Sequence, residues 1–529
     1  MSGQLQGSSP QTVPAALRDT AERHPDTEAL VDGDVRLTWR ELHEAVRQTA
    51  AALIGHGIEP GDRVAIWSPN THHWVRLALG ALYAGATLVP VNTRYTAPEA
   101  LDILRRTRTR ALFVAGRFLG RDRLTELRDR RSGSVPEAPL RKPTRDGDLA
   151  FQPTLTVTVP VETADPEWQA FLAGAEAVPP EEVEKRADAV TGEQVSDVLF
   201  TSGTTGRSKG ACSAHRQVLA VARAWAECGE VTEADRYLVV NPFFHSFGYK
   251  AGILACLVTG ATIVPQRVYD VGEAMRLVAA ERVTVLPGPP TIYATMLDAP
   301  DRPPMPSLRL AVTGAATVPV ALVERMQTEL SFDTVLTAYG LTEAVVATMC
   351  RPDDDPATVA DSCGRATADF EVRLSAEREV LLRGPNVMLG YLDDPAATRE
   401  AIDAEGWLHT GDIGTLDEHG YLKITDRLKD MYICGGFNVY PAEVEQALAR
   451  LDGVSESAVI GVPDERLGEV GKAYVIPRPG AGLSTEDVLA HCRERLANYK
   501  LPRYVEFAGE LPRNATGKIL KRVLREASP

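Results

Sequence analysis

The sequence predicts an α/β protein with a large N-terminal body of several subdomains, in which β-sheets and helices form layers, and a small α+β C-terminal domain. Two observations predict this class. Short apolar runs alternate with helical patterns through most of the chain, as in largely parallel sheets covered by helices. The chain also has 529 residues, more than one ordinary hydrophobic core supports.

The alternation begins near the N-terminus. Residues 39–54 have the apolar spacing of an amphipathic helix, and residues 61–67 form a turn followed by a buried strand. A helix that ends near residue 84 and a strand at 87–91 come next. Further strands are expected at 261–265, 283–286, 308–312 and 334–338.

Two regions depart from this pattern. Residues 117–167 are rich in Arg and Pro and have no clear period, which predicts a solvated surface excursion. A partner-binding role for this segment would have only its charge as support. After residue 431 a separate, smaller alternation follows, with helices at 441–451 and 486–497 and an extended segment at 458–461.

The most informative segment, residues 200–210, reads Phe-Thr-Ser-Gly-Thr-Thr-Gly-Arg-Ser-Lys-Gly. It lies between an expected strand at 195–200 and an expected helix at 215–225. Glycines let backbone N–H groups approach phosphate oxygens, hydroxyls donate further hydrogen bonds, and Lys209 adds positive charge. The spacing of Gly203 and Gly206, with Ser208 before the lysine, excludes the common P-loop. The segment predicts a polyphosphate site, the simpler alternative being a polar surface turn.

Four further motifs follow in a fixed order. They are Tyr-Gly-Leu-Thr-Glu at 339–343, Gly-Trp-Leu-His-Thr-Gly-Asp at 406–412, Asp-Arg-Leu-Lys-Asp at 426–430 with Gly-Gly-Phe-Asn-Val-Tyr-Pro at 435–441, and Pro-Arg-Asn-Ala-Thr-Gly-Lys at 512–518. With the glycine-rich segment, this set resembles the adenylate-forming (ANL) superfamily of AMP-binding enzymes: acyl-CoA synthetases, peptide-synthetase adenylation domains and firefly luciferase. The resemblance extends from about residue 37 to about residue 522. Residues 426–445 are most similar to the acyl-CoA synthetase branch that includes actinobacterial steroid-ring propionate CoA ligases.

The resemblance implies both an organisation and a reaction. Residues 1–426 would form the AMP-binding body, 427–430 the hinge, with Lys429 as its pivot, and 431–529 a mobile lid. A carboxylate would attack the α-phosphorus of ATP with Mg²⁺ present and release pyrophosphate. The acyl-adenylate would then form a thioester with CoA.

The same resemblance implies the residues of the nucleotide site. The β- and γ-phosphates would contact Thr201, Ser202, Gly203, Thr204, Thr205, Gly206 and Lys209. Glu343 would hold Mg²⁺ and Thr342 would contact the α-phosphate, although a helix cap is the alternative for this pair. Adenine would lie between Tyr339, with Gly340 behind it, and the loop of Gly314 and Ala315. Asp412 would accept from the ribose hydroxyls, helped by Arg427.

Three further assignments concern the two half-reactions. Lys518, on the lid, would be the catalytic lysine of adenylation. Gly435 and Gly436 would shape the CoA channel, because glycine permits close backbone approach. His245 resembles an aromatic gate near the acid's carboxylate, although a lone His is more often structural.

The acid itself is predicted only by class. Aromatic residues around His245, namely Phe244, Phe247 and Tyr249, favour a bulky or aromatic carboxylic acid, with Gly314, Gly340 and Val345 as other candidate walls. Residues 344–348 differ from the steroid-degrading relatives, which favours an acid other than a steroid-ring acid. The alternatives are a diazotase that activates nitrite and diazotises an aromatic amine, an adenylation enzyme that loads a carrier protein, and a luciferase-like oxygenase.

Bulk properties limit the partners and the compartment. The net charge of −15 disfavours nucleic-acid binding, and no apolar run is long enough to predict a membrane span. The 7 cysteines are scattered without a Cys-x-x-Cys pair, as expected in a reducing cytoplasm. The remaining partner prediction is a homodimer.

Overall fold

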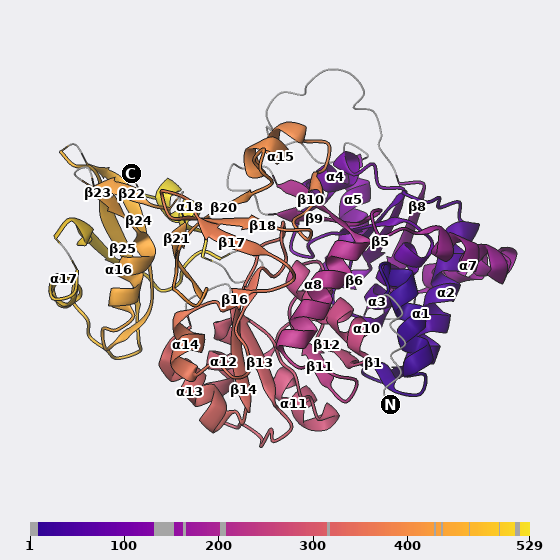
Figure 1. The fold of residues 1–529 in the computed structure, drawn as a ribbon, viewed down its shortest axis with the longest axis horizontal. Helices are drawn as coiled ribbons and strands as arrows, with labels where there is room; N and C mark the ends of the chain where they lie inside the picture. Colours follow the sequence, from indigo (N-terminus) through magenta and orange to yellow (C-terminus); the bar gives the residue numbers. More distant parts are fainter. Residues whose placement is uncertain are drawn as a thin grey trace. The chain divides into compact units, whose positions relative to one another are not determined.

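The computed structural model describes residues 9–131, 153–161, 165–201, 208–314, 318–427, 430–434, 437–464, 466–496, 498–513 and 519–528 (Figure 1). The chain divides into two compact units. The first comprises residues 1–361, 366–370 and 384–400, and the second residues 362–365, 371–383 and 401–529. The mixed α/β class predicted from the sequence is confirmed.

The largest sheet of the first unit has seven strands. Their order is β19 (Gly390–Tyr391), β10 (Lys209–Ala214), β9 (Val195–Thr201), β4 (Thr87–Pro90), β3 (Arg63–Trp67), β5 (Ala111–Ala115) and β8 (Leu155–Val159). Strands β9, β4, β3, β5 and β8 are parallel neighbours, whereas β10 runs antiparallel to both β9 and β19. The sheet is therefore largely parallel, as predicted.

Two smaller sheets supply the other strands of the first unit that are relevant to the site. The first has the order β11 (Arg236–Val239), β12 (Thr262–Pro265), β1 (Glu28–Asp32) and β2 (Val35–Thr38). The second contains β13 (Leu310–Gly314), β14 (Thr334–Tyr339) and β15 (Thr348–Met349), in which β13 and β14 are parallel and β15 returns antiparallel to β14. The short strands β6 (Arg117–Phe118) and β7 (Arg121–Asp122) pair with each other, and β16 spans Arg365–Ala366.

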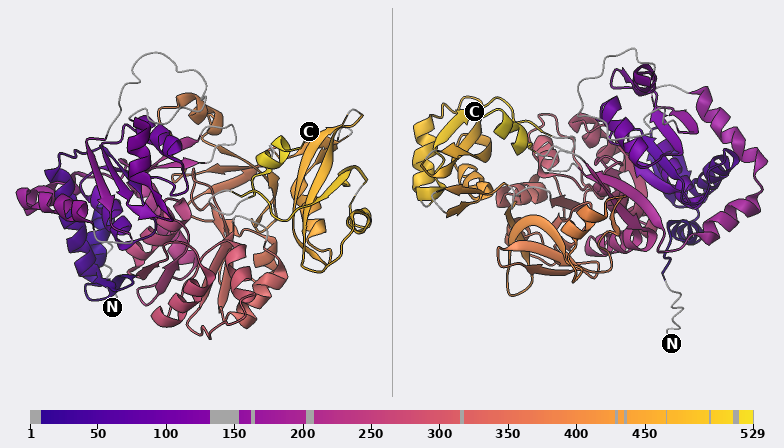
Figure 2. Two further views of the ribbon diagram at one scale, coloured as in Figure 1. Left: turned by 180° about the vertical axis from the view of Figure 1, so that it is seen from behind. Right: turned by 90° about the horizontal axis from the view of Figure 1, so that it is seen from above.

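Helices surround these sheets, as two further views show (Figure 2). They are α1 (Val13–Arg23), α2 (Trp39–Gly55), α3 (His72–Tyr83), α4 (Ala97–Arg106), α5 (Arg123–Arg131), α6 (Pro166–Ala173), η1 (Gly174–Ala177), α7 (Pro180–Ala189), α8 (His215–Cys228), α9 (Ser246–Gly248), the π-helix η2 (Tyr249–Leu254), α10 (Ala255–Thr259), α11 (Val271–Glu281), α12 (Pro290–Leu297), α13 (Val320–Glu329), α14 (Pro356–Asp361) and α15 (Pro395–Ala401).

Helix α2 illustrates why these segments are helical. Thr38 and Glu41 form a capping box, in which each side chain accepts from the other residue's backbone N–H. Leu42, Val46 and Leu53 lie on one face at helical spacing and are fully buried. Among the described helices none is long and apolar enough to cross a membrane.

The described residues of the second unit form two sheets. One contains β17 (Glu371–Leu374), β18 (Glu379–Arg383), β20 (Leu408–Leu416) and β21 (Leu422–Arg427), in that order and antiparallel throughout. The other contains β23 (Phe437–Val439), β22 (Tyr432–Cys434), β25 (Gly468–Pro477) and β24 (Val454–Asp464), with β26 (Tyr504–Phe507) parallel to β25. Its helices are α16 (Pro441–Leu448), α17 (Thr485–Arg493), η3 (Asn498–Lys500) and α18 (Lys521–Glu526).

Three sequence predictions need correction. The glycine-rich segment does not run from a strand directly into a helix, because β10 intervenes and pairs with β9 along six register positions. Residues 283–286 make only an isolated bridge at Val285, between Tyr237 and Leu310. Residues 117–167 are not an irregular excursion throughout, since β8 lies within them and continues the parallel sheet. Residues 132–152 and 162–164 of that segment lie outside the description.

Candidate active site

The loop after β14 places the Thr-Glu pair of the first unit. Tyr339 ends β14 and Thr348 opens β15, so residues 340–347 form the connection of an antiparallel pair. The Ala347 N–H donates to the Tyr339 carbonyl at 2.9 Å and closes this loop. No helix follows Thr342 and Glu343, so the helix-cap alternative for these residues is wrong.

At two positions of the predicted adenine site the backbone packs so closely that only glycine fits. A Cβ on Gly340 would lie 1.7 Å from the Val345 carbonyl oxygen. One on Gly314 would lie 2.4 Å from the Ala338 carbonyl oxygen of the neighbouring strand. Val345 itself adopts φ +60°, a strained value for a β-branched residue. Gly314 and Tyr339 end adjacent parallel strands, where open α/β sheets bind ligands.

The hairpin of β9 and β10 places the ends of the glycine-rich segment. Thr201 and Lys209 are register partners, and the Thr201 hydroxyl donates to the Lys209 carbonyl at 3.3 Å. The Lys209 ammonium lies 3.9 Å from Glu400 Oε2 and 5.0 Å from the centre of the Tyr391 ring. It is therefore held by a weak ion pair and a cation–π contact.

Tyr391 is a site residue that the sequence analysis missed. Its hydroxyl donates to Glu343 Oε1 at 2.7 Å. Burial, followed by the neighbouring Glu343 carboxylate, raises the pKa of Tyr391 well above its ordinary value, so the hydroxyl keeps its proton. The structure thus brings together Lys209, Tyr391 and Glu343, although 48 residues separate the last two in sequence.

The donor set around Glu343 fits a magnesium ion shared with a nucleotide. Mg²⁺ at nucleotide sites takes one or two carboxylate oxygens and completes its shell with phosphates and water. The Tyr391 hydroxyl donates to one oxygen of the Glu343 carboxylate, Oε1, and the carboxylate retains further lone pairs that can bind a metal ion. Over the described part of the chain no three His, Cys, Asp or Glu side chains form a metal cage.

His245 is neutral in this environment. It caps the short helix α9, and its Nδ1 accepts the Phe247 N–H at 3.2 Å. Desolvation lowers the pKa of His245 to about 4. An imidazole that accepts at Nδ1 carries its proton at Nε2, so that atom can donate to an anionic group. Helix η2 follows directly with π-helical geometry, which is frequent at functional sites.

A buried ion pair connects this histidine-bearing segment to the glycine-rich hairpin. Lys250 on η2 and Asp197 on β9 are both fully buried, with 2.9 Å between Nζ and Oδ1. Lys250 also donates to the Ser213 hydroxyl on β10 at 2.8 Å. One lysine therefore joins three segments of the predicted site.

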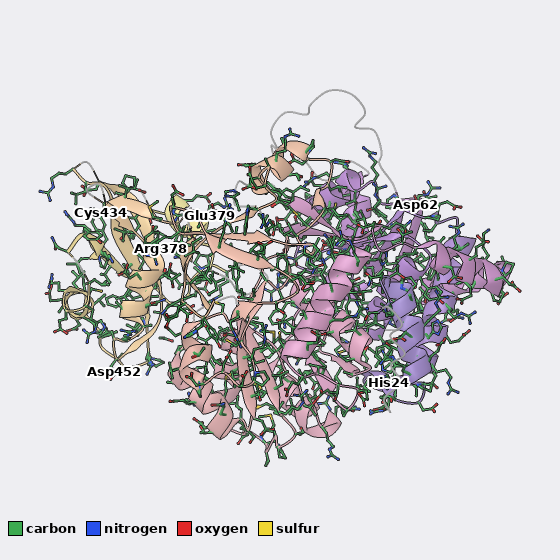
Figure 3. All side chains as sticks on the ribbon, viewed as in Figure 1. His24, Asp62, Arg378, Glu379, Cys434 and Asp452 are labelled. Carbon is green, nitrogen blue, oxygen red and sulfur yellow. The ribbon has the colours of Figure 1, made fainter. Side chains whose placement is uncertain are left out.

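The second unit carries the predicted ribose contacts. Asp412 on β20 is 3% exposed and is the register partner of Arg427 on β21. The strand before Asp412 is fixed by Glu379 (labelled in Figure 3), which accepts from His409 Nδ1 at 2.9 Å and from the Gly411 N–H at 2.9 Å. The Asp412 N–H donates to the Thr410 hydroxyl at 3.1 Å. The carboxylate is thus carried on a rigid strand.

Several predicted residues lie outside the described part of the chain. They are Ser202, Gly203, Thr204, Thr205, Gly206, Ala315, Lys429, Gly435, Gly436 and Lys518, together with the side chain of Arg427. Their roles stay predictions.

Comparison with known proteins decides the family. Residues 17–392 match the AMP-binding enzyme family, and residues 443–518 match the AMP-binding enzyme C-terminal domain. The chain belongs to the AMP-binding enzyme family. Within it, the chain is 60% identical over 98% of its length, and 99% of the relative's, to a methyl-dioxo-octahydroindenyl propanoyl:CoA ligase of Rhodococcus jostii. A Mycobacterium tuberculosis ligase with the same description is 59% identical over 98% of this chain and 99% of its own.

Solved structures of AMP-binding enzymes have the same fold. An anthranilate CoA ligase, AuaEII, in complex with anthranoyl-AMP gives a TM-score of 0.83 at 27% identity, covering 98% of this chain and 97% of that one. The o-succinylbenzoate CoA synthetase of Bacillus subtilis in complex with ATP and magnesium gives 0.78 at 27% identity, covering 96% and 98%.

The reaction class follows from family membership and these similarities. The protein is an enzyme of the acyl-CoA synthetase type, which uses ATP to form an acyl-adenylate and then transfers the acyl group to CoA. The similarities give no support to the diazotase alternative.

Proposed function

We propose that the acid activated by this enzyme is a bulky ring-bearing propanoic acid, of the class named for its relatives in Rhodococcus and Mycobacterium. The observation that carries this proposal is 60% identity across nearly the full length of both chains. The bulky-acid prediction made from the residues around His245 points the same way.

In this proposal, the loop after Glu343 determines which ring-bearing acids fit the site. Val345 is partly exposed in its strained conformation, whereas its neighbours Ala344, Val346 and Ala347 are buried. The Val345 side chain would then border the acid, and its size would select among ring systems. The sequence-based prediction that the acid is not a steroid-ring acid stays a prediction.

The proposed mechanism assigns one task to each part of the site. The His245 Nε2–H would orient the acid's carboxylate without adding a charge that stabilises the ground state. Lys209 and Thr342 would contact phosphates, and Lys518 would stabilise the charge that develops during attack on the α-phosphorus. Magnesium, when bound beside Glu343, would neutralise phosphate charge. Asp412 and Arg427 would fix the ribose, and Tyr339 with Gly314 and Ala315 would hold the adenine.

The remaining predicted residues serve the second half-reaction in this proposal. A boundary at residues 427–430, pivoting at Lys429, would let the lid of 431–529 present Gly435 and Gly436 to the pantetheine of CoA. Seven free cysteines are consistent with a reducing cytoplasm, which we propose as the compartment. We also propose a homodimer, which light scattering after size exclusion tests.

A panel of acids tests the choice of substrate. The rate of CoA-thioester formation is measured at saturating ATP and CoA with bicyclic and aryl propanoates and with straight-chain acids of equal carbon number. The proposal expects kcat/KM at least about 100-fold higher for a ring-bearing acid, because several apolar contacts are lost by a flexible chain. Equal or higher values for the straight-chain acids would refute it.

A further inference from the structure

The segment around β19 lies between two motifs of the active site. At its start, the Met388 N–H donates to the Glu343 carbonyl at 2.8 Å. At its end, the Leu392 N–H donates to the Gly210 carbonyl, next to Lys209, at 2.7 Å. Residues 388–392 therefore join the backbone of the Thr-Glu loop to the backbone of the phosphate-binding hairpin.

Tyr391 repeats this connection with its side chain. The hydroxyl donates to Glu343 Oε1 at 2.7 Å, and the ring face lies 5.0 Å from the Lys209 ammonium. One side chain thus contacts the carboxylate expected to hold the metal and the cation expected to hold the phosphates.

The backbone of Tyr391 is itself well fixed. It is the register partner of Ala211, and its N–H donates to the Thr398 hydroxyl at 2.9 Å. That hydroxyl donates onward to the Asp394 carbonyl at 2.9 Å. The Gln217 side chain also donates to the Val387 carbonyl at 2.5 Å and anchors the start of the segment. Because its backbone is fixed in this way, Tyr391 can restrict the positions of the Glu343 and Lys209 side chains.

We propose that Tyr391 is a positioning residue for the nucleotide–metal site: its hydroxyl orients the Glu343 carboxylate toward the metal, and its ring orients Lys209 toward the phosphates. This inference rests on the proposed metal-holding role of Glu343. Hydrogen-bonded partners of a metal ligand fix its orientation, and their loss commonly weakens metal binding 10- to 100-fold. A carboxylate without its donor would also sample rotamers that point away from the metal.

The test measures metal binding directly, with neither acid nor CoA present. Mn²⁺ replaces Mg²⁺ so that the bound metal can be followed by electron paramagnetic resonance in the enzyme–ATP complex. Tyr391→Phe removes only the hydroxyl, Tyr391→Leu also removes the ring, and Glu343→Gln removes the carboxylate charge. Tyr269→Phe is the matched control, because its hydroxyl bonds Thr295 at 2.7 Å and lies outside the proposed site.

The proposal expects roughly ten-fold weaker Mn²⁺ binding for Tyr391→Phe and no further loss when Glu343→Gln is added. ATP affinity measured in chelator should fall for Tyr391→Leu and stay unchanged for Tyr391→Phe and Tyr269→Phe. Wild-type Mn²⁺ affinity in Tyr391→Phe, or in Glu343→Gln, would overturn the positioning role. Because no acid is present, these outcomes are independent of which acid the enzyme uses.

Discussion

Removing Lys250 should leave an unpaired charge in the interior of the first unit. Lys250 and Asp197 have no exposed side-chain surface, and their charged atoms are 2.9 Å apart. In Lys250→Met, the described residues leave the Asp197 carboxylate with the Ser196 hydroxyl, which donates to Oδ2 at 2.6 Å. Breaking a buried ion pair in this way costs about 3–5 kcal/mol, most of it the desolvation of the remaining charge.

The second substitution in the cycle separates charge from packing. Lys250→Met with Asp197→Asn leaves no buried charge, so the double variant should regain about 2 kcal/mol relative to the sum of the single variants. Lys185→Met is the control, because its pair with Glu182 is exposed at the surface and such pairs contribute about 0–1 kcal/mol.

Urea unfolding followed by tryptophan fluorescence measures these differences. Of the 6 tryptophans only Trp407 lies in the second unit, so the signal reports mainly on the first. A loss below about 1 kcal/mol in Lys250→Met, or strict additivity in the double variant, would refute the reasoning.

Three further outcomes follow, two from the predicted site and one from a buried histidine elsewhere in the first unit. Gly340→Ala should lower adenylate formation about 100-fold in a pyrophosphate-exchange assay, because its Cβ would displace the Val345 carbonyl and with it Glu343; Gly33→Ala, which has positive φ but open space, should keep full activity. Burial lowers the pKa of His215 to about 4, so the unfolded chain binds its proton first and stability should fall as pH drops from about 6.5 to 4. His215→Asn should make that slope shallower by about 1.4 kcal/mol per pH unit, and an unchanged slope would contradict this. Lys518→Ala should abolish adenylation but keep ATP binding by calorimetry, and equal loss of both would exclude its catalytic role.

The fold class and the motif positions could be predicted because their signals are local. The capping box of α2 and the apolar runs of β3, β4 and β14 lie within single segments. Strand β8 also carries a local signal, since Leu-Thr-Val-Thr-Val is rich in β-branched residues, but the surrounding Arg- and Pro-rich stretch obscured it.

The rest depends on contacts between distant segments. Strand β10 consists largely of small residues with little strand preference, and it is extended because it pairs with β9 and β19. Tyr391 has no motif of its own, and only folding brings its hydroxyl to Glu343. The neutral state of His245 likewise comes from burial, which its sequence neighbours indicate only as aromatic surroundings.

The most direct test of the central claim is a single assay of AMP release and product mass. The enzyme is incubated with Mg-ATP and a ring-bearing propanoate, with and without CoA, and with nitrite and an aminoaryl acid in a parallel reaction. We predict AMP release that requires CoA at steady state and one CoA thioester for each AMP. AMP release that requires nitrite and the aromatic amine, ignores CoA and yields no thioester mass would contradict it.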